Sequence, residues 1–166
     1  MTTSETSKKI NSAERRADVR IRVTAGTKSL LCVNASMHPI SNMMKDKIIA
    51  VAGVNDNPEK FGHRIFFGLC EAGYNVFPVG VRGGEVKGVK IFKTLAELSQ
   101  KQKPDLVITV VPPAGTDKIV DDCINLGIKE IWMQPGSQSP EGIKKAEAAG
   151  IKVTQRGCFM VFEGVW

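Results

Sequence analysis

The sequence lacks several features that would each define a class of protein. No apolar run approaches the roughly 20 residues that a membrane-spanning helix needs. The N-terminal stretch MTTSETSKKINSAERR has no apolar segment of the kind found in secretory signals. The four cysteines form no C-x-x-C pair and only two histidines accompany them, so the spacing of a zinc site is missing. We therefore expect a cytoplasmic protein with free thiols, no metal and no membrane association.

Positive charge is concentrated at the N-terminus. The 166-residue chain has a formal net charge of +6, but residues 1–45 hold eight Lys or Arg against three Asp or Glu. Residues 46–166 hold 15 basic and 14 acidic residues, so a basic patch on this part is not needed and nucleic-acid binding is not indicated. Residues 1–45 show no sustained hydrophobic period. We predict a basic leader there, either a disordered tail or an extension ahead of a start near Met44, followed by one domain over 46–166.

From Lys47 onward the patterns of strands and helices alternate. Apolar runs predict strands at 47–53, 75–80, 90–94, 104–112, 130–134 and 151–154. Apolar residues at helical spacing predict helices at 59–73, 95–102, 115–127 and 140–150. Thr94 and Ser139 are placed to cap two of these helices. The alternation predicts an α/β fold, a doubly wound, Rossmann-like parallel sheet in three layers, with a strand order near 3-2-1-4-5.

Such a topology places a ligand at the carboxyl ends of the strands, where the strand order reverses. The loops that meet there are 53–62, 79–84, 111–116 and 134–139. The first, GVNDNPEKFG, brings a helix N-terminus to the crevice, and its free N–H groups favour an anion. Gly53 permits close approach, and Asn55 and Asn57 can order the loop by bonding its backbone. Because the strict G-x-G-x-x-G spacing is missing, an ordinary βα turn without a ligand stays open as the alternative.

The end of the second predicted strand indicates which anion is bound. An NAD site usually places Asp or Glu there, whereas this chain has Arg82 in PVGVRGGE. A guanidinium suits a phosphate, so we predict a ligand phosphorylated on its adenosine ribose, which NADP and coenzyme A both are. Lys87 and Lys90 stand nearby as further cations or as surface charges. The alternative for Arg82 is a solvated arginine on a Gly-rich turn.

Two later loops offer apolar and polar groups to the same rim. The rings of Pro112 and Pro113 suit one face of an adenine or a pantetheine chain, although they also form a rigid stop before a helix. Gln134 and Gly136 follow the fifth predicted strand and add a polar side chain and a point of close approach.

The order of these motifs resembles the coenzyme A-binding protein family. Its members are single-domain bacterial and archaeal proteins with the fold of the N-terminal domain of succinyl-CoA synthetase α-subunits. The resemblance covers about residues 46–162 and is carried by IAVAGVNDNPEKFGHRI, NVFPVGVRGGE, DLVITVVPP, IWMQPG and a late RGC. By position, it implies coenzyme contacts at Gly53, Val54, Asn55, Asp56, Arg64, Val79, Arg82, Pro112, Pro113 and Gln134.

No catalytic group stands out in the predicted rim loops. The phosphorylated histidine of the synthetases that the chain resembles lies in a later domain. We expect His63 to be a helix-surface or packing residue, with a role as phosphate ligand as the alternative, and Cys158 to be a buried structural residue. The predicted function is therefore non-catalytic binding of coenzyme A or acyl-CoA, with a homodimer or a partner synthetase subunit left open. The alternatives are an NADP-binding oxidoreductase fragment and a nucleotide-sensing regulatory protein whose leader binds DNA.

Overall fold

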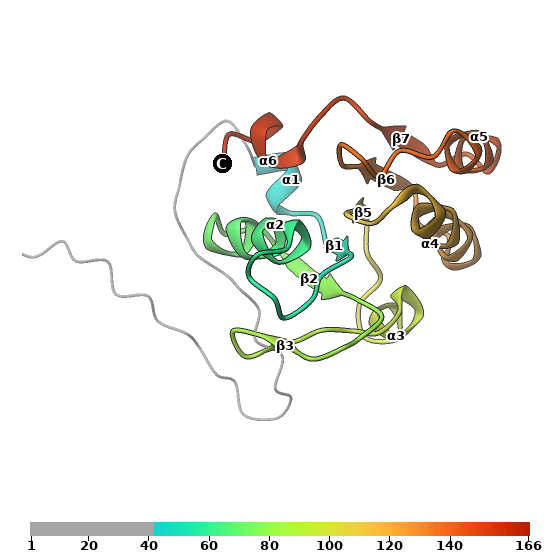
Figure 1. Cartoon of the computed structure of the whole chain (residues 1–166). Coiled ribbons are helices and arrows are strands. Elements are labelled where there is room, and N and C mark those ends of the chain that lie inside the picture. The colour runs from blue at the N-terminus through green and yellow to red at the C-terminus, as the bar shows by residue number, and fades with distance from the viewer. Residues whose placement is uncertain (1–41) are drawn as a thin grey trace, which may run out of the picture.

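The computed structural model describes residues 42–166, so most of the predicted leader lies outside the described residues (Figure 1). Five parallel strands form one sheet in the order β2-β1-β5-β6-β7. Their bounds are β1 Ile49–Ala52, β2 Val76–Val79, β5 Leu106–Thr109, β6 Glu130–Met133 and β7 Lys152–Thr154. The order reverses between β1 and β5, which confirms the predicted doubly wound fold.

The third predicted strand, at 90–94, is wrong as a member of the main sheet. Instead, β3 (Glu85–Val86) and β4 (Val89–Lys90) form a separate antiparallel hairpin. Only Phe92 pairs with the outer edge of β2, through a single parallel bridge to Val79. The reason is local, because Gly83, Gly84 and Gly88 all have positive φ and turn the chain before a longer strand can form.

Four helices occupy the predicted regions, and two short ones were not predicted. The four are α2 Phe61–Glu71, α3 Leu95–Ser99, α4 Pro113–Leu126 and α5 Pro140–Ala148, and the short ones are α1 Asn42–Lys45 and α6 Phe159–Phe162. Thr94 and Ser139 cap α3 and α5 as expected, accepting hydrogen bonds from the backbone N–H groups of Glu97 and Gly142. Helix α4 begins two residues earlier than predicted because proline, with its preset φ, suits the first position of a helix.

The sheet separates two apolar clusters. Alternate residues of β1 point to opposite faces: Ile49 and Val51 pack with α2 and α6, and Ala50 and Ala52 pack with α3, α4 and α5 (Figure 1). All residues of β1 are at most 2% exposed, as expected for a strand buried on both faces. Met44 also packs against the first cluster, so ordered packing begins within the segment predicted as leader.

Two further expectations meet a correction in the structure. Phe61, one of the apolar residues whose helical spacing predicted the helix at 59–73, is 62% exposed and does not face the core. Cys123 and Cys158 are free thiols as expected, whereas Cys70 is disulfide-bonded. Within the described range, the structure has no helix long and apolar enough to cross a membrane.

Candidate functional site

The loops that follow β1, β2 and β5 are in direct backbone contact. The N–H groups of Gly53 and Val54 both donate to the carbonyl of Val79, at 2.9 and 3.0 Å. A Cβ on Gly53 would lie 2.3 Å from the carbonyl oxygen of Val110, and one on Gly80 would lie 1.8 Å from that of Val54. Only glycine permits these approaches, so the two glycines bring three strand ends to one point.

Side chains of the first loop hold its own backbone, as predicted. The amide oxygen of Asn55 accepts from the N–H of Asn57 at 3.1 Å, and that of Asn57 accepts from the N–H of Glu59 at 2.9 Å. His63 reaches back from α2 and places its Nδ1 3.1 Å from the carbonyl oxygen of Asn55. His63 is therefore not a simple surface residue, because it ties the loop to the first turn of the helix.

The N-terminus of α2 offers donors for an anion. Lys60, at the N-cap, provides no side-chain cap. The backbone N–H groups of Phe61, Gly62 and His63 make no hydrogen bond with any described residue. Unsatisfied first-turn amides and the helix dipole are the features with which a helix N-terminus can bind an anion. The amides of Gly53 and Val54 are already bonded to Val79, which the sequence did not reveal. The amides of the first turn of α2 are therefore the ones that could donate to an anion.

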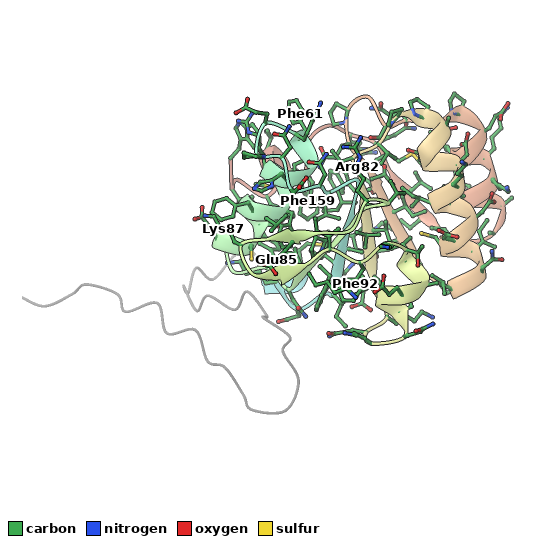
Figure 2. All side chains as sticks on the ribbon, turned by 60° about the horizontal axis from the view of Figure 1, so that its bottom comes forward. Phe61, Arg82, Glu85, Lys87, Phe92 and Phe159 are labelled. Atoms are coloured by element: carbon green, nitrogen blue, oxygen red, sulfur yellow. The ribbon has the colours of Figure 1, made fainter. Side chains whose placement is uncertain are left out.

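Arg82 stands exposed on the turn that follows β2, near the carboxyl edge of the sheet (Figure 2). Among the described residues it has no ion-pair or hydrogen-bond partner. The two lysines considered as further phosphate ligands have partners of their own. Lys87 Nζ lies 3.5 Å from the centre of the Phe67 ring, and Lys90 Nζ lies 2.7 Å from a Glu97 oxygen.

One lysine near this turn was missed by the sequence analysis. A Cβ on Gly83 would lie 3.2 Å from Cε of Lys93, so the Lys93 side chain runs alongside the turn that carries Arg82. The two residues are 11 positions apart, and only the hairpin between them brings them together. No local pattern in the sequence could have indicated this neighbour.

The loops that follow β5 and β6 are tied to each other. Val111 N–H donates to Ser137 Oγ at 3.1 Å, and Thr116 Oγ1 donates to the Ser137 carbonyl at 2.7 Å. Pro112 and Pro113 are exposed at the start of α4, where they are free to contact a ligand. The rim is therefore rigid on the side of the two prolines.

Gln134 is buried at the end of β6 with part of its side chain unsatisfied. It is 3% exposed, and its Oε1 accepts from the N–H of Phe159 at 3.4 Å. Its Nε2 has no hydrogen-bond partner among the described residues. A buried donor of this kind normally has a partner, so it points to a ligand or solvent molecule at this edge.

The remaining predicted contact residues differ in what they can offer. Val54 and Val79 are 2% and 6% exposed with side chains in the core, so only their backbone faces the rim. Asp56 is exposed at the tip of the first loop. The guanidinium of Arg64 lies 5.7 Å from the centre of the Phe61 ring and 5.1 Å from that of Trp166. Arg64 thus lies beside the C-terminal residue, with its guanidinium over two aromatic rings.

One of the free thiols, Cys123, is fully buried. Burial raises the pKa of the Cys123 thiol to about 12, with a smaller contribution from the Asp122 charge, so this thiol stays protonated at neutral pH. Cys123 belongs to the core cluster under α4. No group of three His, Cys, Asp or Glu residues able to hold a metal ion occurs between residues 42 and 166.

Taken together, the reversed strand order, the Gly53 turn and the α2 N-terminus define a single Rossmann-like domain, with unbonded backbone amides where α2 begins. Residues 47–163 match the model of the CoA binding domain family, and the chain belongs to this family. The prediction from the order of the motifs is thereby confirmed.

Known relatives include parts of larger ligases and small proteins of about this size. The chain is 38% identical over 84 residues to the α-subunit of an ADP-forming acetate–CoA ligase II of Pyrococcus furiosus, a match that covers 50% of this chain and 18% of the subunit. It is 24% identical over 123 residues to the uncharacterised protein YneT of Bacillus subtilis, covering 74% of this chain and 90% of that one. The chain thus spans less than a fifth of the ligase subunit.

Among solved structures, a conserved hypothetical protein of Pyrococcus furiosus superimposes with a TM-score of 0.65 at 32% identity, over 70% of this chain and 98% of that chain. A hypothetical protein of Pyrococcus horikoshii gives a TM-score of 0.65 at 28% identity, over 80% of this chain and 99% of that chain. Both are small proteins almost wholly covered by the match.

Proposed function

We propose that this protein binds coenzyme A through its 3′-phospho-ADP moiety. The diphosphate lies at the three unbonded amides of the first turn of α2, and the ribose phosphate lies at Arg82. The observation that carries the proposal is this pairing of an uncapped helix N-terminus with a cation that has no described partner, at the point where three strand ends meet. Membership of the CoA binding domain family supports it.

The pantetheine arm runs past the other half of the rim in this proposal. The exposed rings of Pro112 and Pro113 give it an apolar surface, and the unpartnered Nε2 of Gln134 gives it a hydrogen-bond donor. A pantetheine chain carries amide carbonyls between short apolar segments, so it needs both kinds of contact. The free coenzyme and a thioester both satisfy this arrangement.

We also propose that binding takes place without catalysis by this chain. Two hydroxyls of the rim are engaged in structure: Ser137 Oγ accepts from Val111 N–H, and Ser139 Oγ donates to Asp117 at 2.5 Å while capping α5. His63 is bonded to the first loop. The ligase activity of the longer relatives is consistent with chemistry performed by the parts of those subunits that this chain does not match. A role as a carrier of the coenzyme, or as a partner of a larger synthetase, fits this arrangement.

Calorimetric titration with coenzyme A, dephospho-coenzyme A, NADP and NAD tests the proposal. We expect the tightest binding with coenzyme A and at least tenfold weaker binding of the dephospho form, because a charge-assisted contact at Arg82 is lost. Arg82→Ala should abolish this preference, whereas Lys144→Ala, at an exposed position on α5, should retain it. Silence towards coenzyme A contradicts the proposal, and tighter binding of NADP favours the oxidoreductase alternative.

A further inference from the structure

A second, separate groove lies on the face of β6 and β7 that α4 and α5 do not cover. Val153 of β7 packs towards α5, so Lys152 and Thr154 point to the opposite face. On that face α2 packs against β1 and β2, and α6 is only four residues long. Among the described residues no helix covers β7 there, and a groove of about 460 Å³ results.

The floor and walls of this groove are mainly apolar. Leu106 and Trp132, which are 2% and 4% exposed, form its floor. Met44 and Phe162 stand at its side, and the Phe162 ring lies 5.1 Å from the Trp132 ring, centre to centre. The indole N–H of Trp132 already donates to the Gly157 carbonyl at 3.0 Å, so the floor presents carbon surface and no free donor. An aliphatic chain matches such a surface better than a polar ring does.

The rim of the groove carries an excess of positive charge. Its one acidic residue, Glu130, is neutralised by Lys47 at 2.6 Å and by Lys152 at 3.8 Å. Arg156, which also lines the groove, makes no ion pair with any described residue. The Lys152 side chain is 69% exposed, which leaves its ammonium group accessible as well. The charge available to a ligand is therefore cationic, and it stands beside apolar surface.

We propose that this groove binds a straight-chain aliphatic carboxylate of medium length. Its carboxylate pairs with the guanidinium of Arg156, a geometry that allows two parallel hydrogen bonds. Its hydrocarbon chain lies over Trp132, between Met44 and Phe162. The volume lies within the range of about 300–1,000 Å³ that is usual for small-molecule sites. This site is distinct from the anion site at the N-terminus of α2.

The chain contains two tryptophans, which makes a direct optical test available. In the full-length Trp166→Phe variant, Trp132 is the sole tryptophan, and Trp166 itself packs on Arg64 and does not line the groove. A bromine atom quenches indole fluorescence on contact. We expect 10-bromodecanoate to quench Trp132 saturably, and decanoate to compete with it at least tenfold better than 1-decanol or decyltrimethylammonium.

Charge variants then test the orientation of the ligand. Arg156→Ala should weaken decanoate binding about five- to tenfold, as expected for a partly solvated ion pair, and leave decanol binding unchanged. Arg156→Lys should recover part of the loss, and Lys144→Ala should have no effect. A melting temperature unchanged from that of the parent shows that each variant is folded. Absence of saturable quenching, equal competition by decanol, or an Arg156→Ala variant that binds decanoate normally would each overturn the proposal.

Discussion

Gly62, in the first turn of α2, packs directly against the carbonyl group of Gly53 at the end of β1. A Cβ on Gly62 would lie 2.1 Å from the Gly53 oxygen and 2.8 Å from its carbonyl carbon. The contact is between two backbones, so no flexible side chain can move aside. It seats the N-terminus of α2 on the first strand and aims the free amides of that turn at the carboxyl edge of the sheet.

This contact predicts that Gly62→Ala is destabilising although alanine favours helices. The added methyl group must push α2 away from Gly53, and overpacking of this kind costs about 1–3 kcal/mol. Urea unfolding measures the loss, and coenzyme A affinity should fall with it. Gly68→Ala, on the same helix, is the matched control, since its Cβ would meet only the terminal methyl group of the flexible Met160 side chain, at 2.5 Å. Equal stability of the two variants would show that α2 is not seated by Gly53.

The bond between His63 and Asn55 predicts a role in ordering the first loop. Its distance of 3.1 Å joins a ring nitrogen to a backbone oxygen, and a partly exposed bond of this kind contributes about 1 kcal/mol. His63→Ala should release residues 55–60, raise their amide exchange rates and weaken coenzyme A binding about fivefold. His63→Asn, whose amide nitrogen occupies nearly the position of Nδ1, should restore most of both properties. If neither substitution changes exchange in the loop, the bond does not order it.

The buried thiol of Cys123 predicts a dependence of stability on pH in the alkaline range. Its pKa is raised from 9.0 to about 12 in the folded protein, so the unfolded chain loses this proton at lower pH than the folded one. The contribution is fully present below pH 9, and it is lost as the pH rises towards 12. The free energy of unfolding should therefore fall above pH 9 more steeply for the parent than for Cys123→Ala.

Urea unfolding of both proteins at several pH values between about 7.5 and 10.5 measures this difference. Cys158→Ala provides the comparison at a thiol that is only partly buried. Parallel curves for the parent and Cys123→Ala would mean that the thiol is solvated in the folded state.

Most of the fold followed from patterns in the sequence. A continuous apolar run, as in β1, is the local pattern of a strand buried on both faces. Apolar residues at helical spacing are the local pattern of an amphipathic helix. The caps at Thr94 and Ser139 were predictable for the same reason, since each cap bonds a backbone group three residues away. The prediction of a strand at 90–94 was wrong because its apolar residues belong to a hairpin and to a single bridge with β2. The glycines that turn the chain lie outside this run of residues.

The candidate site was predictable in its location and less so in its details. Loops 53–62 and 79–84 follow β1 and β2, and the topology rule predicted that they meet at the carboxyl ends of these strands, where Gly53 and Val54 bond to Val79. That a ligand binds there stays a prediction. The partners of individual groups were not accessible to this reasoning. Three contacts of this kind form only when the chain folds. The Val79 carbonyl accepts from the amides of Gly53 and Val54, the Arg64 guanidinium lies over the rings of Phe61 and Trp166, and the Lys93 side chain lies beside Gly83.

The sequence by itself determined the alternation of strands and helices, and with it the parallel sheet and the edge at which an anion can be held, because hydrophobic periodicity and capping are properties of neighbouring residues. The tertiary structure alone decided which donors at that edge remain unbonded. It also decided that no helix within residues 42–166 covers the face of β7 that lines the groove beside Trp132 and Arg156. Both depend on which distant segments cover one another, and hydrophobic periodicity shows that a face is buried but not which segment covers it.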